Sequence, residues 1–282
     1  MLDVVLDAVI DTVKLLPFLF VTYLLMEWLE HKTSEKTKNI IRNSGKFGPV
    51  IGGLLGAVPQ CGFSAAASNL YAGRVITVGT LVAIFLSTSD EMLPIMISEQ
   101  IQPGSILGIL GIKILIGVIA GFVIDSVIGK KQKVEKIEVG IGHVCRHDHC
   151  HCDKSVVKSS LKHTAVIMIF IFVISLALNT LLFFVGEDAL AGFILDRPVL
   201  GPVLSALVGL IPNCAASVVI TQLFIEGVIS FGSMMAGLLA GSGVGLLVLF
   251  KVNDKWKDNV KIMAAVYVIG TVCGIVMNLL AG

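Results

Sequence analysis

The stretch GPVIGGLLGAVPQCGFS at residues 48–64 aligns without a gap on GPVLSALVGLIPNCAAS at residues 201–217, after a shift of 153 residues. The match continues to Ser89 and Ser242, and 15 of these 42 positions are identical. A common apolar composition would match leucine with valine, but it would not place a P-x-C motif in register. The chain is therefore predicted to contain two copies of one unit.

The composition predicts an all-α polytopic membrane protein. Of 282 residues, 55% are hydrophobic and 15% are charged, with a mean hydropathy of +0.92, whereas soluble chains carry about 25% charged residues. Four apolar stretches approach or reach the length of a spanning helix, at 15–29, 105–128, 165–185 and 262–280. The first lacks a small-residue cleavage site and is expected to be a retained span. The six cysteines show no paired extracellular pattern, so no disulfide framework is expected.

The basic residues predict the orientation of the chain. Three polar segments, 31–46, 129–162 and 251–261, carry 17 of the 21 lysines and arginines, which places them in the cytoplasm. Residues 1–128 then form the first transmembrane repeat, 129–162 a cytoplasmic linker, and 163–282 a second repeat of inverted topology. Both termini are expected outside a multi-pass cytoplasmic membrane protein. Inverted repeats are typical of secondary transporters, whose substrate site lies where the copies meet.

The segment around Pro59 predicts two short apolar helices in each repeat. Each half has about 13 residues and is about 20 Å long, shorter than the hydrocarbon core. The halves are either short full spans, which gives ten spans in all, or a re-entrant hairpin. The following spans are also broken, at 87–91 and at 241–245. Non-helical backbone at membrane depth is tolerated where it lines a cavity or is buried in protein, so these breaks indicate a central site.

Polar residues at these breaks are the candidate substrate ligands. Thiols favour soft ions and metalloids, whereas amide and hydroxyl oxygens favour harder ions. Acids at membrane depth often mark an ion pathway, although Asp90 and Glu91 could instead lie at the outer surface. Lys113 either pairs with one of these acids or extends to the outer interface. The candidate set is Gln60, Cys61, Ser64, Asn213, Cys214, Ser217, Asp90 and Glu91.

The central loop contains the sequence HVCRHDHCHCD at residues 143–153. Alternating histidine and cysteine side chains can bind a transition-metal ion. The spacing does not match a zinc finger, so a flexible metal collector or sensor is the interpretation preferred over a chance polar linker. No other cofactor is expected. The candidate ligands are His143, Cys145, His147, His149, Cys150, His151 and Cys152.

The chain resembles a bacterial family of ten-span heavy-metal exporters, whose members are labelled manganese transporter or arsenic efflux protein. The resemblance rests on the duplicated G-x-[VI]-P-[QN]-C-x-x-S element, on STSDEMLP at 87–94, on the central His/Cys loop and on KHTAVIMIFIFVISLALN at 162–179. It covers nearly the whole chain and implies export across the cytoplasmic membrane. It does not identify the ion.

We therefore expect a secondary exporter of a metal or metalloid ion, embedded in the lipid bilayer and without a nucleic-acid partner. The chain has no nucleotide-binding loop, so transport would be coupled to protons, to another ion gradient or to a partner ATPase. A homo-oligomer is compatible with the sequence. An organic-anion or other small-solute transporter, with anions held by helix N-termini, is the alternative. An enzyme is not expected, because no nucleophile and base are paired at membrane depth.

Overall fold

The computed structural model describes residues 47–58, 61–89, 92–128, 156–185 and 199–281, together with a few residues before position 25. Every regular element in these ranges is a helix, which agrees with the all-α fold predicted from composition. A search of the described residues finds four segments long and apolar enough to cross a membrane, the first of which also runs over residues 90 and 91: Val78–Ser98, Pro103–Val127, Phe231–Val252 and Trp256–Leu280. The protein is thus an all-α polytopic membrane protein.

The helices fall into two sets with corresponding bounds. The first set is α3 (Gly48–Gly56), α4 (Cys61–Ala72), α5 (Val78–Ser87), α6 (Met92–Ser98) and α7 (Pro103–Ile128). The second set is α11 (Leu200–Gly209), α12 (Cys214–Ile225), α13 (Phe231–Ala240), α14 (Gly245–Val252) and α15 (Trp256–Ala281). The starts of α4, α5, α6 and α7 each differ by 153 residues from those of α12 to α15. Only α9 (Val156–Val185) stands between the sets in the described residues.

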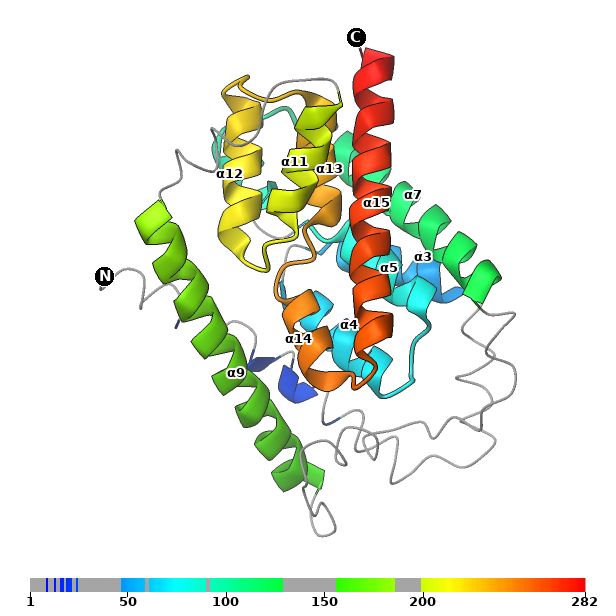
Figure 1. Ribbon diagram of the computed structural model, residues 1–282, viewed down its shortest axis with the longest axis vertical. Helices are drawn as coiled ribbons and strands as arrows, with labels where there is room; N and C mark the ends of the chain where they lie inside the picture. Colours follow the sequence, from blue (N-terminus) through cyan, green and yellow to red (C-terminus); the bar gives the residue numbers. More distant parts are fainter. Residues whose placement is uncertain are drawn as a thin grey trace.

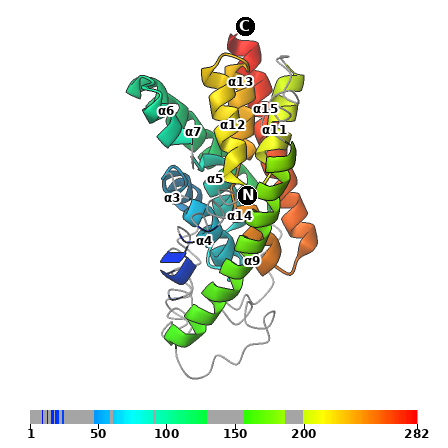
Figure 2. The same cartoon turned by 90° about the vertical axis from the view of Figure 1, so that its left-hand side faces the viewer.

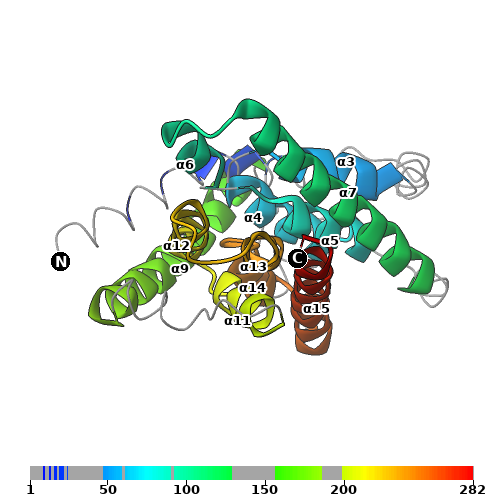
Figure 3. The same cartoon turned by 90° about the horizontal axis from the view of Figure 1, so that it is seen from above.

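The equivalent long helices α7 and α15 run in opposite vertical senses. Figure 1 shows α15 rising to the C-terminus, whereas α7 descends to its green end. The short helices α11 and α12 lie side by side in the upper part of the molecule, and α3 and α4 lie below them. Figure 2, turned by 90°, shows the same vertical order. In Figure 3, seen from above, α7 and α9 flank the molecule on opposite sides.

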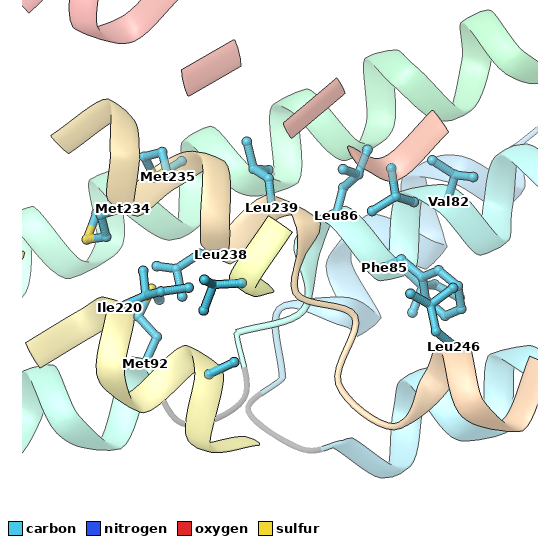
Figure 4. Packing of buried hydrophobic residues seen from close by; sticks show 14 of the residues in the cluster. Val82, Phe85, Leu86, Met92, Ile220, Met234, Met235, Leu238, Leu239 and Leu246 are labelled. Atoms are coloured by element: carbon cyan, nitrogen blue, oxygen red, sulfur yellow. The ribbon is translucent and has the colours of Figure 1, made fainter. Parts of the chain in front are cut away.

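The interrupted helices α5–α6 and α13–α14 form the core of the molecule. Residues 79–87 of α5 and 232–240 of α13 are all buried, because both helices are surrounded by their neighbours. Figure 4 shows how residues of the two sets meet there, with Phe85 beside Leu246 and Met92 beside Ile220. The core is therefore shared between the sets.

Short helices of each set also pack directly on helices of the other set. The second-set helix α14 packs on α4, and the second-set helix α12 packs on α6. At the first of these contacts, the Ser68 hydroxyl oxygen lies 2.7 Å from the carbonyl oxygen of Gly245 and 3.0 Å from that of Ser64, and these two acceptors share its one hydrogen. These contacts place α14 against a short helix of the first set and α6 against a short helix of the second set.

The same polar contact fixes the N-terminus of α5 and that of α13. Asp125 of α7 accepts from the Gly79 N–H at 2.8 Å and from the Thr77 hydroxyl at 2.7 Å. In the second set, Asn278 of α15 accepts from the Gly232 N–H at 2.9 Å. Each side chain binds a main-chain N–H that has no intrahelical partner in the first turn of a helix. A carboxylate and an amide therefore perform the same structural task at equivalent positions.

Replacing Asp125 tests this equivalence. Asp125→Asn is expected to leave the melting temperature of the detergent-solubilised protein within about 2 °C, because an amide oxygen serves at Asn278. Asp125→Ala is expected to cost about 1–2 kcal/mol, since it leaves the Gly79 N–H and the Thr77 hydroxyl without their acceptor. Equal melting temperatures for the two variants would contradict this role.

Candidate functional site

A small cavity lies where the helix breaks of both sets converge. Its volume is about 10 Å³, which is room for about one water molecule or one bare ion. Thr88 and Ser89 contribute from the break after α5, and Asn213 and Ser217 from the α11–α12 tip. The remaining lining residues come from the last turns of α11 and α13 and from the break after α13: Gly209, Gly237, Leu238, Gly241 and Gly243. The side chains offered to the cavity are thus neutral hydroxyl, amide and aliphatic groups.

Two glycines allow the helices α11 and α13 to approach closely at this cavity. A methyl group added at Gly209 would lie 2.1 Å from the carbonyl oxygen of Gly237, so only glycine fits there. The close approach places the last turn of α11 directly against α13. The carbonyl of Gly237 accepts from the Gly241 N–H at 2.9 Å, so this wall of the cavity consists of hydrogen-bonded main chain from α13 packed against α11.

The break after α5 is held by its own hydroxyl groups. The Thr88 hydroxyl donates to the carbonyl of Ile84 at 2.8 Å, within the last turn of α5. The Ser89 hydroxyl donates to the carbonyl of Ala57 at 2.7 Å, which ties this break to the end of α3. The equivalent Ser242 hydroxyl is buried without a hydrogen-bond partner in the described part of the chain. The two breaks thus differ although their helices correspond.

Lys113 is a buried cation beside the cavity. It lies near the middle of α7 with none of its surface exposed. Its ammonium donates to the carbonyl of Leu238 at 2.9 Å and also to the carbonyl of Thr88. The expectation that Lys113 extends to the outer interface is therefore wrong, because main-chain oxygens of both sets hold the ammonium inside. The equivalent residue in the second set is the buried Val266.

The structure brings some of the predicted ligands together and separates one from them. Asn213 and Ser217 line the cavity. Ser64 is buried away from the cavity, against the start of α14. A methyl group added at Gly245 would lie 2.7 Å from the Cβ of Ser64. Cys61 and Cys214 are the first residues of α4 and α12, and their side chains lie outside the described atoms. Gln60, Asp90 and Glu91 lie outside the described residues, as does the His/Cys loop from His143 to Cys152.

The breaks at 87–91 and 241–245 are predicted from the sequence to lie at a central site, although Thr88, Ser89, Gly241 and Gly243 are not among its candidate ligands. Gly209 and Gly237 lie inside helices, so no break in the helix pattern indicates them. Within the described ranges no three His, Cys, Asp or Glu side chains gather to hold a metal. An ion in this cavity would therefore meet hydroxyl, amide and main-chain oxygens, with the two helix-initiating cysteines close by in sequence.

Comparison with protein families gives one match that covers the chain. A family model described as "Putative, 10TM heavy-metal exporter" matches residues 1–189 and 183–282. A search of curated proteins found no match. A search of solved structures also found none.

Proposed function

Because the chain belongs to this family of 10TM heavy-metal exporters, we propose that it exports a metal or metalloid ion through the central cavity. The observation that carries the proposal is the convergence of breaks from both sets on one cavity of ionic size. Interrupted helices with polar main-chain ends are the usual binding elements of secondary transporters. The cargo is a manganese-like divalent cation or an arsenite-like metalloid.

The two sets act as inverted repeats in this proposal. The opposite directions of α7 and α15 support it, as do the two short-helix pairs at different heights (Figures 1 and 2). Described basic residues also support a cytoplasmic lower face. Lys251 lies in the last turn of α14, and Lys257 and Lys261 lie in the first two turns of α15, where both helices reach the lower part of Figure 1. Export would then proceed from this face to the face where α15 ends.

In an alternating-access mechanism, the cavity is the place where the ion is bound during transport. The ion enters from one face, is enclosed where the two sets meet, and leaves when the sets change their relative position. A cavity of about 10 Å³ is large enough to hold one bare ion at the enclosed step. Energy comes from an ion gradient or a partner ATPase, since the sequence has no nucleotide-binding loop. The His/Cys loop would collect or sense metal on the cytoplasmic side.

Flux measurements in proteoliposomes test the proposal. Purified protein is reconstituted, and uptake of manganese, zinc and arsenite is compared with that of empty liposomes. Asn213→Ala with Ser217→Ala is expected to lower flux at least tenfold, because both side chains line the cavity. Ser126→Ala is the matched control, since its hydroxyl bonds to Phe122 on the exposed side of α7. Absence of flux for every ion in the wild type, or equal flux in all variants, would contradict the proposed function.

The same assay examines the thiols. Cys61→Ser with Cys214→Ser removes both helix-initiating thiols and retains two hydroxyl groups. Loss of arsenite flux in this variant indicates a thiol-seeking cargo, whereas retention of manganese flux indicates a cargo bound by oxygen.

A further inference from the structure

Resting on the proposed function, we infer that the contact between α4 and α14 is the cytoplasmic gate of the transporter, and that it is closed in this structure. Gly245 at the start of α14 is the residue that allows the gate to close. The equivalent contact between α6 and α12 is the outer gate. Neither the cavity nor the family match identifies the contacts that open during transport.

The helices α4 and α14 lie between the cavity and the proposed cytoplasmic face. The helix α14 begins at Gly245, two residues after Gly243 of the cavity wall, and Lys251 lies in its last turn. Arg74 follows the end of α4. Figure 2 shows both helices below α6 and α12, which lie in the upper part of the molecule. An ion that enters from the cytoplasm on this side must therefore pass α4 and α14.

The start of α14 lies directly against α4, because residue 245 has no side chain. A methyl group added at Gly245 would lie 2.7 Å from the Cβ and 3.0 Å from the carbonyl carbon of Ser64. It would also lie 2.9 Å from a ring carbon of Phe85. The hydroxyl oxygen of Ser68 on α4 lies 2.7 Å from the carbonyl oxygen of Gly245, so this hydroxyl bridges the two sets. The two helices are thus as close as a glycine permits.

An apolar cluster continues this contact along both helices. Ala65 and Ala72 of α4 belong to it together with Val248 and Val252 of α14, and all four are buried. The cluster also includes buried isoleucines of α9, and α14 buries five of its eight residues. Small residues let helices pack closely in a membrane, and an apolar contact offers an ion nothing that replaces its water. The contact therefore seals the cavity from the cytoplasm.

The equivalent contact between α6 and α12 is built with larger side chains. Met92 stands at the position equivalent to Gly245, and its side chain lies beside Ile220 of α12 (Figure 4). Valine, valine and isoleucine at 218–220 take the place of three consecutive alanines of α4. The Thr221 hydroxyl donates to a carbonyl of its own helix at 2.7 Å. Two of the seven residues of α6 are buried, so this contact is the less tightly closed of the two.

Two serines at equivalent positions differ because the two gates are in different states. Ser217 of α12 lines the cavity, whereas Ser64 of α4 is covered by the start of α14. Repeats of inverted topology move against each other around a fixed site. The opposite state therefore separates α14 from α4, uncovers Ser64 to the cavity and lets the ion enter from the cytoplasm. The close packing at Gly245 makes the closed gate the resting state of the empty protein.

Hydrogen–deuterium exchange of the purified full-length protein in detergent, without added ion, tests the inference. Gly245→Ala is expected to speed exchange at 61–72 and 245–252 about tenfold or more, because the methyl group holds α14 away from α4. Exchange at 92–98 and 214–225 is expected not to rise, since the outer gate closes as the cytoplasmic gate opens. General unfolding would instead speed exchange in all four helices.

Ser68→Ala tests the same gate without adding an atom. It removes the hydroxyl that reaches Gly245, and we expect exchange in α4 and α14 to rise about threefold, as for the loss of one hydrogen bond. Thr221→Val is the matched control, because the equivalent hydroxyl stays within α12. Gly108→Ala is the control for Gly245→Ala, since nothing lies within 4 Å of a methyl group there. Both controls are expected to exchange as the wild type does in α4 and α14.

Liposome flux separates this inference from the proposed function. Gly245→Ala is expected to lower flux about tenfold or more, because the gate no longer closes behind the ion. Wild-type exchange in α4 and α14 of both Gly245→Ala and Ser68→Ala, or an equal rise in all four helices, would overturn the inference. If the wild type carries manganese, zinc or arsenite while Gly245→Ala exchanges and transports normally, only this inference fails. If the wild type carries none of these ions, the proposed function fails, and selective opening of α4 and α14 would still identify their contact as a movable gate.

Discussion

Gly209→Ala is expected to lower the stability of the protein by about 3 kcal/mol or more and to abolish transport. The added methyl group would lie 2.1 Å from the Gly237 carbonyl oxygen, and the atom it meets is rigid main chain. Helices α11 and α13 must therefore separate, which opens the wall of the cavity. Close helix approach through small residues is a main source of packing energy in membranes, so the lost contact is not recovered elsewhere.

Melting temperature, yield of monodisperse protein and liposome flux measure this effect together. Gly111→Ala serves as the control, because its methyl group meets nothing within 4 Å and alanine is the better helix former. A Gly209→Ala variant that melts and transports like the control would show that α11 and α13 do not need this contact.

Phe85→Ala is the second large effect, with an expected loss of about 3–5 kcal/mol. Phe85 is completely buried, and its ring lies beside Leu246 of the other set (Figure 4). A methyl group on Gly245 would lie 2.9 Å from a ring carbon, so the ring packs tightly against the start of α14. Removal of the Phe85 ring leaves a cavity between α5 and α14. We expect that these two helices cannot move together far enough to fill it.

The control for Phe85 is Phe122→Ala, because Phe122 is 38% exposed on the outer side of α7. We expect this control to lose less than about 1 kcal/mol. Thermal unfolding in detergent, followed by the loss of monodisperse protein, compares the two. Similar melting temperatures for both variants would contradict the packing of Phe85 described above.

The sequence predicts the helix bounds well at prolines and at glycine-rich breaks. Proline cannot continue a helix, and the structure ends α3 at Gly56 and α11 at Gly209, a few residues before Pro59 and Pro212. The breaks after α5 and α13 also lie where the pattern of apolar residues is interrupted. Local chemistry determines these features, and a single sequence therefore contains them.

The composition of the site could not be predicted in the same way. Ser64 and Ser217 occupy equivalent positions in the sequence, yet only Ser217 lines the cavity. The difference arises from how α4 and α12 pack against helices of the other set, which no local pattern encodes. The partners of Lys113 were also missed, because they include main-chain carbonyls, and every residue has a carbonyl whatever its side chain.

Lys113 also distinguishes this single chain from a symmetric pair of identical chains. A protein assembled from two separate copies of one repeat would carry two lysines at this depth, or none. Two ammonium groups facing one small cavity would repel each other and any cation between them. This chain carries a lysine at one position and a valine at the other, so it holds a single buried charge that a symmetric dimer could hold only in duplicate.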